Sequence, residues 1–304
     1  MKILFPDNLL NPREVDPDFA EEYEAARQAG FTPELVSLET LNREGDANRA
    51  IRRVVPGQEG GEPILYRGWM LKSTAYEKLF EALATKNQAL LTSPAAYRHA
   101  HHLPEAYPLL VPHAPATVWQ TLSGPPDFTS IMELLQPFGG KPVLLKDYVK
   151  SQKHYWHEAC FIPNSSDTEA VQQVVNRFLE LQGDDLNEGL VFREYRPLMP
   201  LAQPSRSGLP QPEEYRLFFL HHRLLAVYPY WEEGKYEQAF PASEWATQVA
   251  APIQSPFFSM DVARTQAGEW IVIELGDGQV SGLPEAADIT DFYQKLHWEL
   301  MPSI

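Results

Sequence analysis

The stretch FFSMDVARTQAGEWIVIELGDGQVSGLP, residues 257–284, decides the fold of this chain. Two apolar runs flank the polar residues 266–269, a pattern typical of two antiparallel strands joined by a short turn. A turn of these four residues pairs Thr265 with Trp270. The sequence therefore predicts a β-hairpin here, and the turn fixes the register of its strands.

This register places two acidic side chains opposite each other. Asp261 faces Glu274, on the same side of the sheet as Ala263 and Val272. Like charges that face each other across a sheet are destabilising. They become favourable when a divalent cation lies between them, and Mg²⁺ prefers one or two carboxylates together with phosphate oxygens. The hairpin thus predicts a magnesium site; the alternative is two exposed acids without a ligand.

The hairpin is followed by a glycine-flanked turn, GDGQVSG, that carries Asp277, Gln279 and Ser281. Glycine lets the backbone approach a ligand closely. We therefore expect this turn to bring Asp277, Gln279 and Ser281 close to a ligand, with Gln279 and Ser281 binding substrate.

Lysines gather in only one place, at Lys141, Lys146, Lys150 and Lys153. In VLLKDYVK the alternation of a strand puts Lys146, Tyr148 and Lys150 on one face. Two ammonium groups on one face are favourable when a polyphosphate lies beside them. The alternative is a solvated edge strand whose lysines prevent aggregation.

Arginines at strand ends and on strand faces suggest further binding groups. Arg216 lies in the mostly apolar strand EYRLFF and needs an anionic partner, either a phosphate or an internal carboxylate. Arg67 ends a strand of the first part of the chain, where α/β sheets place ligand-binding groups, although a structural arginine fits equally well. The strand that stops at Arg193, Glu194 and Tyr195 could present its backbone to an adenine edge, as could any edge strand.

Composition excludes several classes of function. The chain has 304 residues, 44% of them hydrophobic, with a formal net charge of −16. This charge argues against a nucleic-acid or membrane surface, since either needs a basic footprint. Cys160 is the only cysteine, which excludes an internal disulfide framework. With no apolar run of about 20 residues and no signal-peptide core, we expect a cytoplasmic protein.

The chain divides into two parts. Strand and helix patterns alternate over residues 1–95, which predicts a small α/β lobe. The remainder, residues 96–304, combines helices with antiparallel strand pairs and is of the α+β class.

The order of these motifs is more specific than any one of them. LYRGWMLK, VLLKDYVKSQKHYW, EYRLFF and MDVAR…IVIELGDGQVSGLP follow one another as in the ATP-grasp superfamily, which the whole chain resembles. The residues of these motifs resemble a divergent, mostly bacterial branch of this superfamily, which is related to the eukaryotic cell-division-cycle assembly factor of translation initiation factor two. The resemblance implies an ATP-grasp fold with an N-terminal pre-ATP-grasp lobe and two further subdomains that clamp ATP.

The resemblance also implies roles for residues. Lys146, with Lys150 nearby, would contact the phosphates of ATP, and Arg216 would face the γ-phosphate, so Lys146 and Arg216 are the expected catalytic residues. The adenine would bind at residues 193–195, and magnesium at Asp261 and Glu274. Most ATP-grasp enzymes carry asparagine two residues after this glutamate, whereas this chain has Gly276 there. The resemblance therefore implies that Asp277 or Gln279 takes its place, and we expect Asp277 to be the further metal ligand.

The predicted function is an ATP- and Mg²⁺-dependent carboxylate–amine ligase that acts through an acylphosphate on a peptide or protein. The alternative is a nucleotide-binding assembly factor that grips a partner protein without modifying it. The presence of Arg216 favours the enzyme, because a clamp without chemistry needs a γ-phosphate contact less.

Overall fold

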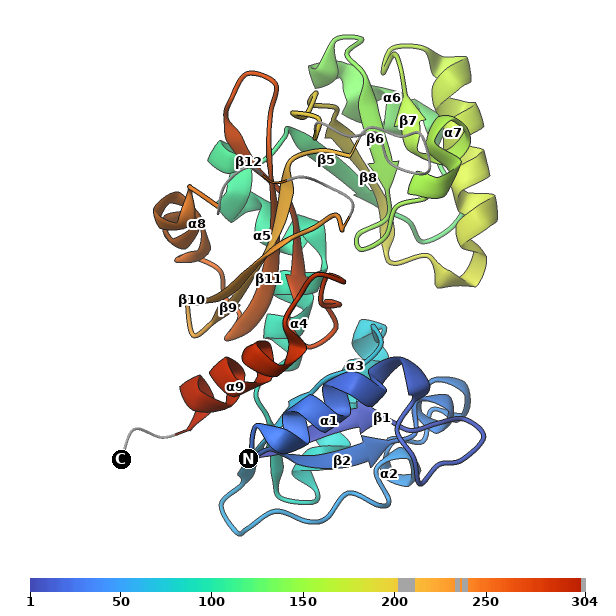
Figure 1. The fold of residues 1–304 in the computed structure, drawn as a ribbon. Coiled ribbons are helices and arrows are strands. Elements are labelled where there is room, and N and C mark those ends of the chain that lie inside the picture. The colour runs from blue at the N-terminus through green and yellow to red at the C-terminus, as the bar shows by residue number, and fades with distance from the viewer. Residues whose placement is uncertain (202–210, 233–235, 237–239, 302–304) are drawn as a thin grey trace.

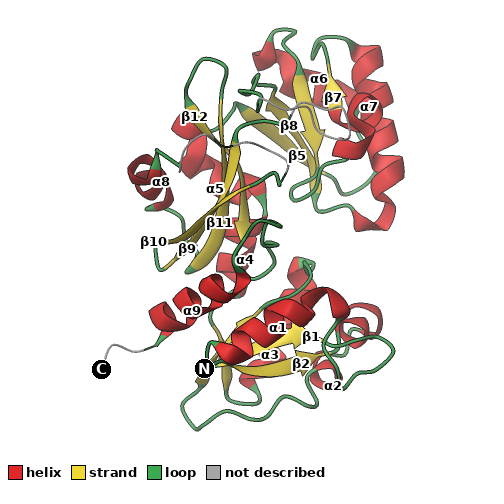
Figure 2. Cartoon of the chain, viewed as in Figure 1, coloured by secondary structure: helices red, strands yellow, loops and turns green. Residues whose placement is uncertain are grey.

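The computed structural model describes residues 1–201, 211–232, 236 and 240–301. Within these residues the strands form three sheets of four strands each, with helices packed on them (Figure 2). No helix in this part of the chain is both long and apolar enough to cross a membrane.

The N-terminal lobe is built on a parallel sheet whose strands are β1 (Lys2–Pro6), β2 (Thr32–Val36), β3 (Glu62–Tyr66) and β4 (Gln88–Leu90). Their order in the sheet is β2-β1-β3-β4. Every residue of β1 is buried, as expected of a central strand covered on both faces. The predicted α/β character of this part of the chain is confirmed.

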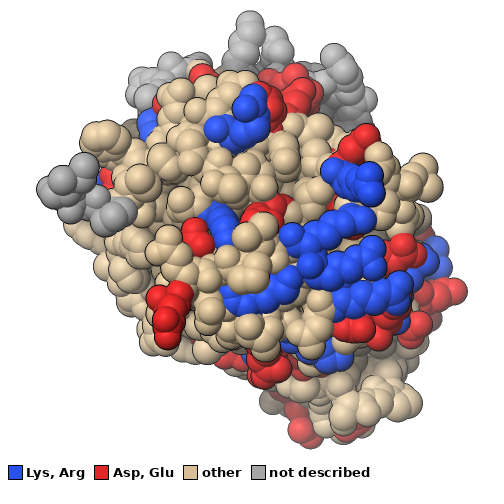
Figure 3. All heavy atoms as spheres, turned by 90° about the horizontal axis from the view of Figure 1, so that it is seen from below, with Lys and Arg blue, Asp and Glu red and all other residues tan. Residues whose placement is uncertain are grey.

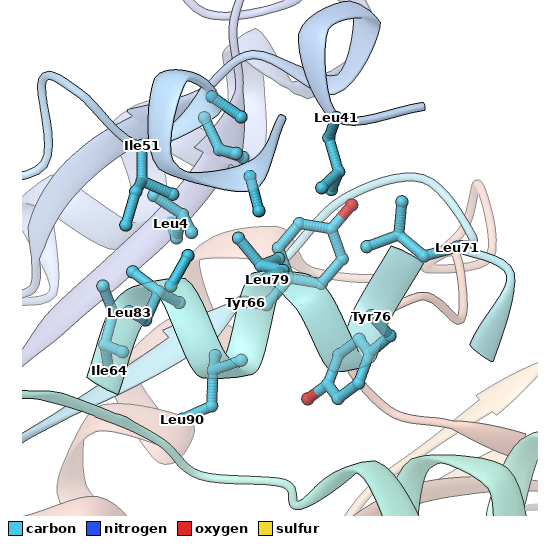
Figure 4. Packing of buried hydrophobic residues seen from close by; sticks show 14 of the residues in the cluster. Leu4, Leu41, Ile51, Ile64, Tyr66, Leu71, Tyr76, Leu79, Leu83 and Leu90 are labelled. Atoms are coloured by element: carbon cyan, nitrogen blue, oxygen red, sulfur yellow. The ribbon is translucent and has the colours of Figure 1, made fainter. Parts of the chain in front are cut away.

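The helices of this lobe are α1 (Ala20–Gln28), α2 (Ala47–Ala50) and α3 (Ser73–Ala84). The amphipathic helix α3 turns Tyr76, Leu79 and Leu83 towards the sheet, where they pack on the side chains of β1 and β3 (Figure 4). Val280, from the far end of the chain, packs in the same cluster. The core of the lobe is therefore completed by a residue of the GDGQVSG turn.

A second, antiparallel sheet consists of β5 (Thr117–Thr121), β6 (Val143–Lys146), β7 (Phe161–Ile162) and β8 (Gly189–Glu194). Its order is β5-β8-β6-β7. The helices α6 (Phe128–Leu135) and α7 (Thr168–Gln182) bury their apolar faces against it. In Figure 1 this unit lies at the upper right, away from the N-terminal lobe.

The third sheet is also antiparallel and consists of β9 (Glu214–Leu220), β10 (Arg223–Pro229), β11 (Phe257–Arg264) and β12 (Trp270–Asp277), in the order β10-β9-β11-β12. One face packs on α4 (Pro94–His101), α5 (Leu103–Leu110) and α8 (Ser243–Ala250). The other face changes character along the strands. It is apolar at Phe218, Leu220 and Phe257, where α9 (Ile289–Leu300) covers it, and charged farther along. Strand alternation thus leaves one charged region on an otherwise buried sheet.

Two helices connect the lobes. Tyr97 of α4 belongs to the core of the N-terminal lobe, whereas Ala100 of the same helix packs on the third sheet. The C-terminal helix α9 returns to the N-terminal lobe, where Phe292 and Leu296 pack with Phe5 of β1 (Figure 1). The predicted boundary between residues 95 and 96 falls inside α4 and stays a prediction.

The register of the hairpin differs from the expected one at the turn and agrees with it farther along. Trp270 pairs with Arg264 rather than Thr265, so the predicted pairing at the turn is wrong by one residue. A bulge at Ile273 then inserts one residue into β12 and restores the pairing of Asp261 with Glu274. As a result Val272 points to the opposite, apolar face, and its predicted place beside Glu274 is wrong.

Candidate active site

Three charged residues lie side by side across the third sheet. Asp261 on β11 pairs with Arg216 on β9 and with Glu274 on β12. Arg216 donates from Nε to Oδ1 of Asp261 at 2.8 Å and from Nη2 to Oδ2 at 2.7 Å. This two-pronged geometry is the strongest that an arginine and a carboxylate form. The internal carboxylate that Arg216 needed is therefore Asp261.

A fourth charge comes from the second sheet. Lys146, the last residue of β6, places Nζ 2.5 Å from Oε1 of Glu274 and 3.0 Å from the carbonyl of Val149. Lys146 is 9% exposed, whereas the side chain of Glu274 is 40% exposed. We call Lys146, Glu274, Asp261 and Arg216 the charged row. It joins residues 128 positions apart and links the second sheet to the third.

The repulsion expected between Asp261 and Glu274 is offset in this structure, because each carboxylate has a cation beside it. Burial raises the pKa of Asp261, although Arg216 acts against this rise. Burial acts in the same direction on Glu274, but Lys146 and Arg216 outweigh it, and the pKa of Glu274 is lowered. Asp261 is therefore the acid of the pair with the raised proton affinity, and burial is the main cause.

Arg193 crosses from the second sheet to the third. Its guanidinium donates to the carbonyl of Val272 at 2.7 Å and to the carbonyl of Ile273, the bulged residue. Burial lowers the pKa of Arg193 to about 10, against the opposing effect of Glu274. The side chain of Arg193 thus holds the bulge that positions Glu274.

The other two residues of the predicted adenine edge lie at the end of β8. The amide of Glu194 donates to Ala116 and its carboxylate binds Lys141 at 3.0 Å. The amide of Tyr195 donates to the carbonyl of Pro142, and its ring packs edge-on against Phe161. The three residues are therefore contiguous at the strand end, but the side chain of Arg193 points away to β12.

The strand expected to carry both Lys146 and Lys150 ends at Lys146. The carboxylate of Asp147 accepts hydrogen bonds from the amides of Val149 and Lys150, and this closes a turn. The prediction that Lys146, Tyr148 and Lys150 share one strand face is therefore wrong. Lys150 is exposed. Asp147 was the residue that could have predicted this turn, because aspartate side chains often bond the backbone two residues on, but the interpretation of the stretch as a continuous strand did not use it.

Glu214 is a residue of this region that the sequence analysis missed. It lies two residues before Arg216 on the same face of β9 and is 7% exposed. Trp231 donates from Nε1 to its carboxylate at 3.2 Å. Burial, with a further contribution from Asp261, raises the pKa of Glu214 to about 8. The i, i+2 spacing to Arg216 was the signal that could have identified it.

Lys153 and two aromatic rings border the charged row. Its Nζ lies 5.9 Å from the ring centre of Tyr230 and 5.8 Å from that of Trp231, while the guanidinium of Arg216 lies 4.9 Å from the Tyr230 ring. The negative face of an aromatic ring attracts such cations. Lys153 therefore adds a third cationic side chain to Lys146 and Arg216 of the row, and an anion could use all three.

Arg67, Gln279 and Ser281 lie at the junction between the N-terminal lobe and the end of β12. Arg67, 1% exposed, binds Glu22 through Nε at 2.6 Å and donates to the carbonyls of Gly278 and Ser281. Gln279 donates to the hydroxyl of Tyr76 and accepts from the amide of Tyr66. These buried contacts join the lobes, as the structural alternative for Arg67 supposed.

Asp277 is in this junction and is fully buried. Its Oδ1 accepts from the amide and the side chain of Gln279, while its Oδ2 has no hydrogen-bond partner among the described residues. Burial raises the pKa of Asp277 to about 7, although Gln279 and Arg67 oppose this rise. The described residues contain no group of three or more metal-ligating side chains, so Asp277 is not brought together with Asp261 and Glu274.

The comparison with family models identifies the chain. Residues 137–296, more than half of its length, match the ATP-grasp domain of R2K clade family 3. The chain belongs to this ATP-grasp family. The charged row and its whole supporting sheet lie inside the matched segment.

Solved structures show the same ATP-grasp fold. D-cycloserine synthetase DcsG is 15% identical, with 99% of this chain and 100% of that chain covered and a TM-score of 0.60. A RimK domain ATP-grasp protein from Sphaerobacter thermophilus DSM 20745 is 12% identical (97% and 98% covered, TM-score 0.59). The ATP-grasp ligase PsnB, in complex with precursor peptide PsnA2 and AMPPNP, is 12% identical (98% and 97% covered, TM-score 0.54).

These identities establish the fold alone. No curated protein matches the chain. None of the comparisons shows the relationship to the eukaryotic assembly factor that the sequence motifs suggested.

Gly276 stands where most ATP-grasp enzymes carry asparagine, and the structure explains why a side chain does not fit. A β-carbon there would lie 2.6 Å from Oγ of Ser281 and 2.9 Å from Oγ of Ser259. These two hydroxyls are hydrogen-bonded to each other at 2.6 Å. In this ATP-grasp chain two serines fill the space beside the glycine and leave no room for an asparagine side chain.

We predict that Gly276→Ala destabilises the protein by about 1–3 kcal/mol, because the added methyl group overpacks a filled space. The same change should cost much less in a Ser259→Ala/Ser281→Ala background. Thermal or urea denaturation of wild type and the three variants gives the coupling energy. Equal costs in both backgrounds would show that the serines do not set the size of this space.

A second prediction concerns Asp277. Its pKa is about 7 in the folded chain and near 3.8 when unfolded, so the folded state holds the proton more tightly. The tighter proton binding adds to the free energy of unfolding. This contribution is fully present below about pH 4 and is lost as the pH rises to about 7. Asp277→Asn stays neutral throughout, so the stability of wild type relative to this variant should fall between these pH values. Parallel curves of melting temperature against pH would contradict the assignment.

Proposed function

We propose that this chain is an ATP- and Mg²⁺-dependent carboxylate–amine ligase that forms an acylphosphate on a peptide or protein substrate. The charged row carries the proposal. It places two cations suited to a polyphosphate, Lys146 and Arg216, beside two carboxylates suited to magnesium, Asp261 and Glu274.

The donor set fits the proposed ligands. A protein usually supplies one or two carboxylates to a magnesium site, and phosphate oxygens of the substrate supply further ligands. In the structure each carboxylate is paired with a protein cation at 2.5–2.8 Å. Binding of Mg²⁺–ATP would exchange these partners, because Lys146 and Arg216 would bind phosphate oxygens and the acids would bind the metal. When bound, magnesium would neutralise charge on the phosphates.

The reaction needs positioning rather than a side-chain nucleophile. An oxygen of the substrate carboxylate attacks the γ-phosphorus, the bond to ADP breaks, and an acylphosphate forms. The nitrogen of the amine then attacks the acyl carbon, and phosphate leaves as the C–N bond forms. Arg216 and Lys146 would stabilise the negative charge that moves through the phosphoryl group.

Glu214 would accept the proton that the amine loses. It lies on the same sheet face as Arg216, and burial raises its pKa to about 8. A base whose pKa lies near the operating pH is suited to proton transfer. Residues 193–195 would remain the adenine edge, with Lys150 near the phosphates. We assign Arg67, Gln279 and Ser281 to positioning the end of β12 rather than to direct substrate contact, because their polar groups are committed to the lobe junction.

The peptide substrate class is supported by one relative of the same fold. The ATP-grasp ligase PsnB has been crystallised with its precursor peptide. The decisive experiment measures ADP release and peptide mass after incubation with Mg²⁺–ATP and candidate peptides. A partner captured only in the presence of ATP, with no mass change and no ADP, would favour the assembly-factor alternative.

We predict that Lys146→Ala weakens ATP binding by ~2–3 kcal/mol, the value of a charge-assisted contact in a partly dry site. Lys141→Ala is the matched control, because Lys141 belongs to the same lysine cluster but its side chain is 66% exposed. Calorimetry on both variants, with circular dichroism to verify folding, measures the difference. Equal, small losses would show that Lys146 serves only the ion pair with Glu274.

We further predict that Arg216→Lys keeps ATP affinity within a few-fold but lowers kcat by about 10²–10³, because the charge stays and the fork is lost. The lysine variant is preferable to alanine, since alanine would leave Asp261, 4% exposed, without its cation. Single-turnover ADP release separates binding from chemistry. An unchanged kcat with raised KM would place Arg216 in ground-state binding only.

A further inference from the structure

A second polar cavity lies in the N-terminal lobe, apart from the charged row. It has a volume of about 190 Å³, and its described lining comes from that lobe alone. Asp7 and Asn8 follow β1, and Ser37 follows β2, so the cavity opens at the carboxyl ends of two parallel strands. Ligands of open α/β sheets bind at this end.

Arginines supply the positive charge of this cavity. Arg49, Arg52 and Arg53 all line it, in a chain whose formal net charge is −16. Figure 3 shows the face seen from below in Figure 1, on which Lys and Arg side chains gather in a band. Three guanidinium groups around one small cavity repel one another unless an anion lies among them.

The acidic side chains that line the cavity do not neutralise all three arginines. Glu44 is paired with Arg49, and Glu39 with Arg43 at 2.9 Å. Asp7 accepts a hydrogen bond from Ser37, and burial raises its pKa against the opposing effects of Ser37, Arg53 and Arg52, so this one carboxylate faces both arginines. These acids are each engaged by a neighbour.

Two arginines have binding capacity left. Arg53 donates to the carbonyl of Pro12, which holds its guanidinium in place. The backbone of Arg52 is hydrogen-bonded to Arg49 and Lys86, whereas its guanidinium forms no hydrogen bond or ion pair within 4 Å in the described residues and acts on Asp7 only through its charge. A guanidinium presents several donors in a planar fork that fits a carboxylate with two hydrogen bonds. The hydroxyls of Ser37 and Thr40, 3.2 Å apart, add neutral donors.

An ordered apolar loop borders the cavity. Leu9, which lines it, is 62% exposed, and Leu10 is 93% exposed. The loop is held by the side chain of Asn8, which accepts from the amide of Leu10 at 2.8 Å, and by the Asn8 amide, which donates to Glu14. Two leucines fixed towards solvent offer a contact for an apolar side chain next to the anion site.

We propose that this cavity binds an acidic peptide segment, with a carboxylate side chain between Arg52 and Arg53 and a neighbouring apolar side chain on Leu9 and Leu10. The size of the cavity fits one side chain rather than a nucleotide. The apolar loop distinguishes a peptide from a free anion, which would use the arginines alone. The site lies outside the proposed active site and needs neither ATP nor catalysis.

The test is fluorescence anisotropy without nucleotide, at physiological salt, on a labelled peptide of alternating Leu and Glu residues. The matched peptide has Gln in place of each Glu. We expect the Gln peptide to bind about tenfold or more weakly, as for the loss of a charge-assisted pair. We expect a similar loss for Arg52→Gln/Arg53→Gln, and a loss of a few-fold for Leu10→Ser.

The control variant is Arg27→Gln/Arg177→Gln, which removes one exposed and one half-buried arginine elsewhere and changes the net charge equally. It should bind the peptide as wild type does. Equal weakening by both double variants, or no difference between the two peptides, would overturn the proposal. So would displacement of the peptide by inorganic phosphate together with full binding by Leu10→Ser, since the cavity would then be a site for a free anion. A failed ligase assay would leave these outcomes unaffected, because the measurement contains no ATP.

Discussion

The one-residue bulge at Ile273 is the constraint on which the charged row depends. Without it, the turn would carry its own register along β12, and Asp261 would face Ile273 rather than Glu274. The bulge also turns Val272 into the apolar core and leaves a carbonyl that Arg193 takes. A single inserted residue therefore sets which side chains of β12 face the second sheet, and a buried arginine from that sheet holds it in place.

Each charged side chain in the row is paired with one of opposite sign, and this pairing limits which ligands could bind there. Burying an isolated carboxylate or guanidinium is costly, so Arg216 with Asp261 and Lys146 with Glu274 form pairs. A ligand that brings both signs of charge, such as a metal–nucleotide complex, could replace both partners at once. A ligand of one sign would leave a buried charge unpaired. The arrangement therefore favours a metal and a polyphosphate together over either alone.

The N-terminal lobe takes part in the site through the end of β12. Arg67 binds the carbonyls of the turn that follows this strand, Gln279 reaches Tyr76, and Val280 packs in the core of the lobe. The helix α9 then packs between that lobe and the third sheet. Because these contacts fix the residues directly after Glu274, the position of the acid depends on the docking of the lobes as well as on its own sheet.

The sequence by itself determined the parts that follow from local periodicity. Strand alternation and the polar turn identified the hairpin, and the spacing in EYRLFF placed Arg216 on a strand that needed an anion. The predicted pairing of Asp261 with Glu274 holds only because the bulge at Ile273 cancels the one-residue error at the turn, and no local pattern predicted that bulge. Only the tertiary structure decided the partners. The ion pair between Lys146 and Glu274 joins two sheets, and the guanidinium of Arg193 reaches from the second sheet to a strand of the third. The burial of Asp277 depends on the N-terminal lobe. Alternation states which face a side chain occupies, but the packing of sheets and lobes decides what lies opposite that face.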